Sequence, residues 1–125
     1  MNPAQSHKDL IVWQKSIDLA ARIYLLTETF PKEERYGITS QLRRASVSIS
    51  SNIAEGRHRG ANRDYLRFLR IALGSAAEIE SQICIIKKLP WSKDKELSDV
   101  DNLLTEIVKM LKVMIRNLPL SNPNS

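Results

Sequence analysis

The arginine side chains between residues 43 and 70 offer the clearest chemistry in this sequence. This segment holds seven arginines, no lysine and two acidic residues, so it accounts for the whole net charge of +5. The planar guanidinium group pairs with phosphate through parallel hydrogen bonds. Five of these arginines could grip a phosphate backbone from the end of one helix, a loop and one face of the next helix: Arg57, Arg59, Arg63, Arg67 and Arg70. We therefore predict that RNA or DNA binds here.

Two other interpretations of the arginine segment remain open. The arginines can form a solvated face, or they can pair with Glu55, Asp64 or a neighbouring subunit. The pattern predicts no aromatic platform among the arginines on which bases could stack. A protein-interaction scaffold that presents this surface to an acidic protein partner is therefore the alternative function.

Other residue types that support catalysis do not fall into catalytic or metal-binding patterns. His7 and His58 lack the sequence partners of a catalytic triad or a zinc site, and no Glu-x-x-His pair is present. Cys84 lies between two isoleucines, so we expect it to pack in the core. We predict a protein without catalytic residues, metal or cofactor.

Four polar residues near the arginine segment are predicted to be buried and structural: Arg43, Arg44, Asn52 and Glu55. Asn52 falls where helical spacing would place an apolar residue, and Glu55 follows three positions later on the same face. Asn52 and Glu55 could line a polar pocket. We favour a satisfied buried network that fixes the register of the helices.

Hydrophobic periodicity and helix-breaking residues place these side chains on four helices. The predicted helices span residues 10–29, 38–58, 62–89 and 93–118. Helical spacing in the second and heptad spacing in the last two predict a buried apolar stripe on each. Pro31 stops the first helix, Gly60 ends the second, and Asn62 is expected to cap the third. Because the connections are short, neighbouring helices run antiparallel. The predicted fold is all-α, an antiparallel up-down four-helix bundle.

Residues 10–118 are predicted to form a single domain. We expect residues 1–9 to be a flexible lead-in and residues 119–125, rich in Pro, Asn and Ser, to be a disordered tail. No apolar run approaches the roughly 20 residues of a membrane span, and no signal peptide is recognisable. These features predict a cytoplasmic protein with no membrane contact. Gly74 and its small neighbours are expected to face the small residues of the second helix.

The first predicted helix carries two apolar stripes, which is more than one bundle seam needs. The first stripe is Leu10, Trp13, Ile17, Ala20 and Tyr24, and the second is Val12, Leu19, Ile23, Leu26 and Phe30. We expect the second stripe, with a flank of the third helix, to stay uncovered in a monomer. Since uncovered apolar surface marks an interface, the sequence predicts a closed homo-oligomer.

Several short blocks of sequence occur in an order that is typical of one family. The blocks are Leu10-x-Val12-Trp13-Gln14-Lys15, Tyr24-x-Leu26-Thr27 with Phe30-Pro31, Tyr36-Gly37, Ser40-Gln41-x-Arg43-Arg44-Ala45, Ser51-Asn52-Ile53-Ala54-Glu55-Gly56 and Gly74-Ser75-Ala76-x-Glu78. Over residues 9–118 the chain resembles the four-helix-bundle family of 23S rRNA intervening-sequence proteins. Two positions depart from it: Ser50 stands where relatives often carry proline, and Pro90-Trp91 where a Gly-Tyr pair is common.

The resemblance implies a small bacterial protein whose bundle assembles into a ring-shaped homopentamer. Relatives that are encoded beside the reverse transcriptases of diversity-generating retroelements are accessory proteins, and they bind nucleic acid through basic surfaces. Combined with the arginine segment, the resemblance predicts a ring-forming accessory factor that binds RNA or DNA.

Overall fold

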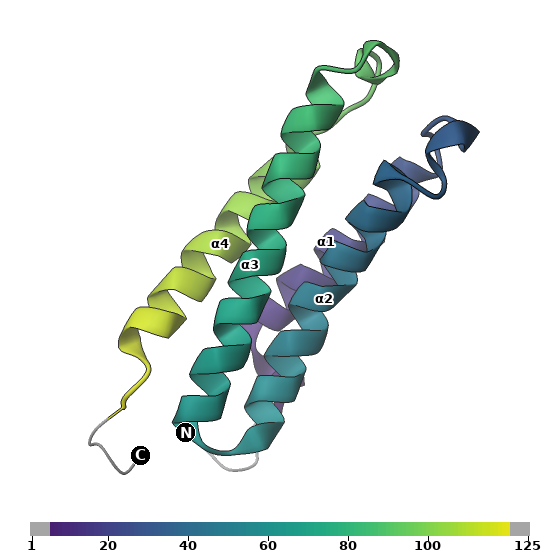
Figure 1. Ribbon diagram of the computed structural model, residues 1–125. Coiled ribbons are helices and arrows are strands. Elements are labelled where there is room, and N and C mark those ends of the chain that lie inside the picture. Colours follow the sequence, from purple (N-terminus) through teal and green to yellow (C-terminus); the bar gives the residue numbers. More distant parts are fainter. Residues whose placement is uncertain (1–5, 121–125) are drawn as a thin grey trace.

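A computed structural model describes residues 6–120 and shows four long helices joined by short connections (Figure 1). The helices are α1 (Ile11–Thr27), α2 (Ile38–Arg59), α3 (Asn62–Lys87) and α4 (Ser98–Asn117), with 3₁₀ turns η1 (His7–Asp9), η2 (Lys32–Glu34) and η3 (Pro90–Ser92). No strand occurs within residues 6–120. The predicted all-α four-helix bundle is confirmed. None of the helices in this range is long and apolar enough to cross a membrane.

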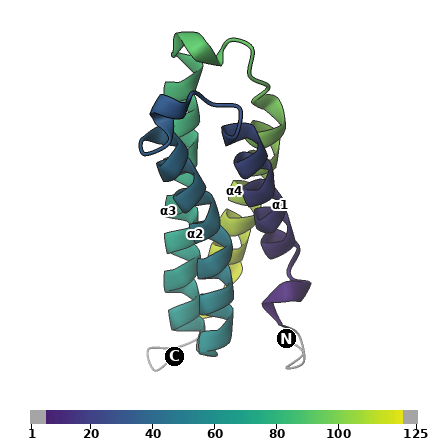
Figure 2. The same cartoon turned by 90° about the vertical axis from the view of Figure 1, so that its right-hand side faces the viewer.

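Consecutive helices lie side by side and run in opposite directions (Figures 1 and 2). α2 packs against α1 and α3, and α4 packs against α1 and α3. The α1–α2 and α3–α4 connections lie at one end of the bundle, which we call the connection end. The α2–α3 connection lies at the other end with η1 and the close of α4, and we call this the terminal end.

Each helix contributes one apolar stripe to a common core. The heptad-spaced residues of α3 are buried from Tyr65 to Ile86, and those of α4 are buried at Val100, Leu104, Ile107 and Leu111. α2 adds Leu42, Ala45, Ile49 and Ile53. The periodicity therefore predicted the buried faces of α2, α3 and α4 correctly.

The two stripes of α1 have the opposite roles to those we expected. Val12, Leu19 and Ile23 of the second stripe are buried, whereas Ile17 and Tyr24 of the first stripe are 43% and 42% exposed. A helix at the corner of a bundle covers only one apolar stripe against α2 and α4, so the other remains at the surface. Cys84 is exposed, so our expectation that it packs in the core is wrong.

α2 and α3 are in close contact at Gly56. A Cβ atom at this position would lie 2.7 Å from Cβ of Phe68 and 3.1 Å from Cδ1 of Tyr65. The α2–α3 turn then follows at Gly60, whose φ of 87° favours glycine, as expected for a helix end. Gly74, which we expected in this contact, is exposed and has no atom within 4 Å of an added Cβ. Ser75 and Ala76 are the buried small residues there.

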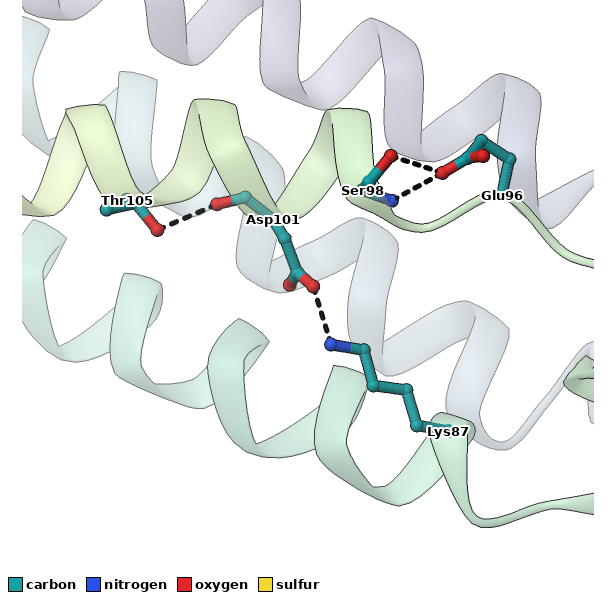
Figure 3. A network of polar contacts seen from close by, with 5 residues as sticks. All are labelled: Lys87, Glu96, Ser98, Asp101 and Thr105. Carbon is teal, nitrogen blue, oxygen red and sulfur yellow. Dashed lines mark hydrogen bonds and ion pairs between the residues drawn. The ribbon is translucent and has the colours of Figure 1, made fainter.

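α4 begins five residues later than predicted, at Ser98 instead of residue 93. The Glu96 carboxylate accepts hydrogen bonds from the backbone N–H of Ser98 at 2.8 Å and from its hydroxyl (Figure 3). These bonds lower the pKa of Glu96, and such a local side-chain bond holds the backbone out of the helix before Ser98. Nζ of Lys87 on α3 donates a 2.6 Å hydrogen bond to Oδ2 of Asp101 on α4, and this hydrogen bond raises the pKa of Lys87.

The residues that precede α1 and α3 supply no side-chain cap to these helices. Asn62 is the first residue of α3, not its cap, and its side chain donates a 2.8 Å hydrogen bond to the carbonyl of Pro119. Ser6 caps the turn η1, while Leu10 precedes α1. We expected residues 1–9 to be flexible and residues 119–125 to be disordered. Of these, residues 1–5 and 121–125 lie outside the described residues, so the expectation stays a prediction, while residues 7–9 form the turn η1.

Candidate nucleic-acid interface

Arg63, Arg67 and Arg70 lie together on the outer face of α3, near the terminal end. All three are exposed, and they line one surface hollow of about 650 Å³. Within residues 6–120 none of the three forms an ion pair, although Asp64 lies in the same hollow. Their guanidinium groups are therefore free to bind an anion from solvent.

An aromatic ring lies between the arginines of α2 and α3. The Cζ atoms of Arg59 and Arg67 lie 5.1 and 4.7 Å from the centroid of the half-buried Phe68 ring. Our expectation that no aromatic platform accompanies the arginines is therefore wrong. The ring joins Arg59 to the α3 arginines because Gly56 allows Phe68 to pack directly on α2. This packing across the α2–α3 contact has no signal in the sequence.

Arg59 is partly neutralised by an ion pair. Its Nε atom lies 3.0 Å from Oε2 of Glu55, one helical turn earlier. Glu55 is exposed, so our prediction that it is buried with Asn52 is wrong. Its position on α2 points away from the core stripe, toward Arg59. An exposed pair of this kind contributes only about 0–1 kcal/mol, so a phosphate could displace the carboxylate.

Arg57 lies apart from the other arginines. Its Cζ atom is 5.7 Å from the centroid of the Tyr65 ring, and its buried Nε has no hydrogen-bond partner within residues 6–120. Burial raises the pKa of the Tyr65 hydroxyl, and the charge of Arg57 partly opposes this shift. Of the five predicted residues, the structure thus groups Arg59, Arg63, Arg67 and Arg70, which we call the arginine surface.

Two histidines that are 51 positions apart meet beside this surface. Nδ1 of His7 and Nε2 of His58 are 2.9 Å apart, and the edge of the His7 ring packs on Trp13. Partial burial and the nearby charges of His58 and Lys8 lower the pKa of His7. We expected two unrelated surface histidines, because neither has a partner nearby in sequence.

Asn52 belongs to a polar network between α2 and α3. Its side-chain N–H groups donate to the carbonyl and hydroxyl oxygens of Ser48 at 2.8 and 3.0 Å. The Ser48 hydroxyl lies 2.8 Å from that of Ser75 on α3. Asn52 is half-buried, so the network lies at the edge of the core and links the two helices. Glu55 takes no part in it.

Arg43 and Arg44 differ in their surroundings. Arg43 is half-buried and donates to the Thr27 hydroxyl at 2.8 Å and to the Tyr24 carbonyl at 3.3 Å. It therefore joins α2 to α1, which agrees with a structural role. Arg44 is exposed, so the prediction that it is buried is wrong. The helical step turns its side chain away from α1. Both arginines border the connection end.

Comparison with known proteins identifies the family. The structure is a small all-α four-helix bundle with an arginine-rich face at one end. The chain belongs to the family of 23S rRNA-intervening sequence proteins, whose model matches residues 8–113. A crystal structure from Bacteroides thetaiotaomicron VPI-5482, described as a protein of unknown function from the S23 ribosomal protein family, is similar with a TM-score of 0.78. It is 28% identical and the match covers 86% of this chain and 96% of that one. No curated protein matches the chain.

Proposed function

We propose that this protein is a non-enzymatic nucleic-acid-binding factor that assembles as a closed homo-oligomer, and that the arginine surface contacts the phosphate backbone. The observation that carries the proposal is the hollow lined by Arg63, Arg67 and Arg70, whose exposed guanidinium groups form no ion pair with residues 6–120. Guanidinium groups pair with phosphate oxygens through parallel hydrogen bonds, so this face could contact a phosphate backbone. Within residues 6–120, there is no group of three or more His, Cys, Asp or Glu side chains that could hold a metal ion.

The aromatic ring of Phe68 supports the same proposal. The guanidinium groups of Arg59 and Arg67 lie over this half-buried ring, and an unpaired base could stack on a guanidinium plane or displace one of them from the ring. Arginines beside an aromatic ring are typical of surfaces that bind single strands with little sequence preference. We therefore expect tighter binding to single-stranded or looped RNA than to duplex DNA.

The test replaces Arg63, Arg67 and Arg70 by alanine together. Each phosphate contact contributes roughly 0.7 to 0.9 to the slope of log affinity against log salt, so the slope should fall by about 2 to 3. Affinity for all sequences should fall by the same factor, because phosphate contacts carry no base information. Fluorescence anisotropy with a labelled hairpin RNA, a single strand and a DNA duplex measures both quantities.

The matched control replaces Lys109, Lys112 and Arg116 on α4, which are exposed, similarly spaced and carry the same charge. The control should bind nearly as well as the wild type if the arginine surface is the contact. Equal loss in both variants would mean that only net charge matters. No binding by the wild type at low salt would favour the alternative, a scaffold for an acidic protein partner.

A further inference from the structure

A second basic region lies at the connection end, far from the arginine surface. A cleft of about 700 Å³ opens there between the close of α1, the turn η2 and the start of α2. Small-molecule sites in proteins have volumes of roughly 300–1,000 Å³, so the cleft is large enough for one such ligand. The connection that frames it is the dark blue segment joining α1 to α2 in Figure 1. At 1.5 Å per residue, Arg44 and Arg59 lie roughly 20 Å apart along α2.

The cleft is strongly positive. Its lining includes four cationic side chains, Lys32, Arg35, Arg43 and Arg44, and one carboxylate, Glu28. Within residues 6–120 neither Lys32 nor Arg35 nor Arg44 forms an ion pair. Arg43 is held in place by its bonds to Thr27 and to the Tyr24 carbonyl. A fixed guanidinium beside three free cations is an arrangement that suits a dianion such as a phosphate monoester.

The start of α2 adds to this field. Its N-cap is Gly37, which supplies no side-chain hydrogen bond to the first turn. The side chains of Thr39 and Ser40 line the cleft, so the first turn of the helix borders it. The amide groups of a first helical turn carry partial positive charge and bind phosphate groups readily. The hydroxyl of the exposed Ser40 is a further donor at the same place.

Two tyrosine rings complete the cleft. Tyr36 is 88% exposed and Tyr24 is 42% exposed, although both are large and mostly apolar. The guanidinium of Arg43 stacks over Tyr24 with its Cζ atom 4.6 Å from the ring centroid. The exposed rings provide faces on which a planar heterocycle can stack. A plain phosphate or an acidic peptide would use the arginines and leave these rings without a partner.

We propose that this cleft binds a nucleoside phosphate, with the phosphate on Arg35, Arg44 and the start of α2 and the base stacked on Tyr36. The site is separate from the arginine surface, so it does not depend on the nucleic-acid proposal. The ligand can be a free nucleotide or the 5′-phosphorylated end of a strand, because both present the same chemistry.

The experiment is isothermal titration of the full chain with adenosine 5′-monophosphate, inorganic phosphate and adenosine. The nucleotide should bind at least about tenfold more tightly than either part alone, since stacking and phosphate contacts add. Arg44→Ala and Arg35→Ala should each weaken nucleotide binding by roughly tenfold. Tyr36→Ala should weaken binding of the nucleotide but leave that of phosphate unchanged.

The three substituted residues are exposed, so the variants should melt like the wild type, and circular dichroism checks this. Arg116→Ala on α4 removes the same charge outside the cleft and should bind the nucleotide normally. A 5′-phosphorylated oligonucleotide that displaces the nucleotide, where its 5′-hydroxyl form does not, identifies a strand end as a ligand. Failure of both to displace it identifies the free nucleotide.

Three results would overturn the proposal. The wild type could fail to bind the nucleotide, or bind phosphate equally well. The Arg35 and Arg44 variants could bind as the wild type does. The variants could change the mass measured by light scattering, which would show that another copy of the chain covers the cleft.

Discussion

Arg43, Arg57 and Arg59 lie on one helix, α2, and each guanidinium lies over an aromatic ring. Such contacts contribute about 0.5–2 kcal/mol, and more where water is excluded. Their surroundings differ: Arg43 is fixed by α1, Arg57 is turned inward over Tyr65, and Arg59 stays at the surface beside Glu55. At the scale of the residue, the neighbours on other helices therefore determine which arginines remain available to a ligand.

The histidine pair leads to a prediction of pH dependence. Because the pKa of His7 is lowered in the folded chain, the unfolded chain binds more protons than the folded chain at pH values between the two pKa values of this histidine. The wild type should lose stability as the pH falls below about 6.5, and this loss should level off below the folded pKa. His7→Gln removes the titrating group and should show a smaller drop in melting temperature between about pH 7.5 and pH 5.5.

Thermal melting followed by circular dichroism measures the effect. Lys112→Gln, at an exposed position of α4, provides a control that should retain the wild-type pH dependence. Identical drops for His7→Gln and the wild type would show that the His7–His58 contact does not alter protonation in solution.

At the scale of the element, α2 packs against both α1 and α3. Its buried face carries Ser46 and Ser50, whose hydroxyls bond to the carbonyls of Arg43 and Val47 within the helix. Gly56 lies on the side toward α3. Small side chains whose polar atoms are satisfied locally allow neighbouring helices to come close.

Substitutions of the two helical glycines, Gly56 in α2 and Gly74 in α3, test this packing as a matched pair. Gly56→Ala places a methyl group against Phe68 and Tyr65, so it should destabilise the fold by about 1–3 kcal/mol less the gain in helix propensity. Gly74→Ala meets open space, so it should stabilise the fold by about 0.5–1 kcal/mol. Urea unfolding gives both values. A stabilised Gly56→Ala variant would mean that α2 and α3 separate without cost.

At the scale of the whole molecule, one apolar region is left at the surface of α1 and α2. Ile17 on α1 and Val47 on α2 are 43% and 42% exposed. Trp13 and Ala20 lie one turn before and one turn after Ile17 on the same face of α1, and both are half-buried. Exposed apolar residues on two adjacent helices are typical of a protein interface. This apolar region supports the proposed closed homo-oligomer, whose number of five follows from the family resemblance alone.

Light scattering tests this assembly. The wild type should have a mass that is a multiple of the 14.2 kDa chain, five-fold for a pentamer. Ile17→Glu combined with Val47→Glu should reduce it to one chain, because an unpaired carboxylate buried in an interface costs about 3–5 kcal/mol. Val113→Glu, at an exposed position of α4 away from the apolar region, should leave the mass unchanged. A monomeric wild type at micromolar concentration would contradict the proposal.

The sequence by itself determined the elements that depend on local pattern. The heptad spacing of α3 and α4 and the breakers Pro31 and Gly60 predicted four helices and the buried faces of three of them. Helical periodicity is a property of neighbouring residues, so it can be recognised without knowledge of the fold. The clustering of arginine between residues 43 and 70 was visible for the same reason.

Tertiary structure decided everything that depends on which helix lies beside which. Either stripe of α1 satisfies helical spacing, and only packing against α2 and α4 selected the one that holds Leu19. The Phe68 ring between Arg59 and Arg67, the His7–His58 contact and the cleft beside Arg44 each join segments through space. Their geometry follows from the antiparallel pairing of helices and the close approach at Gly56, because side chains from separate helices meet only where the backbones allow it.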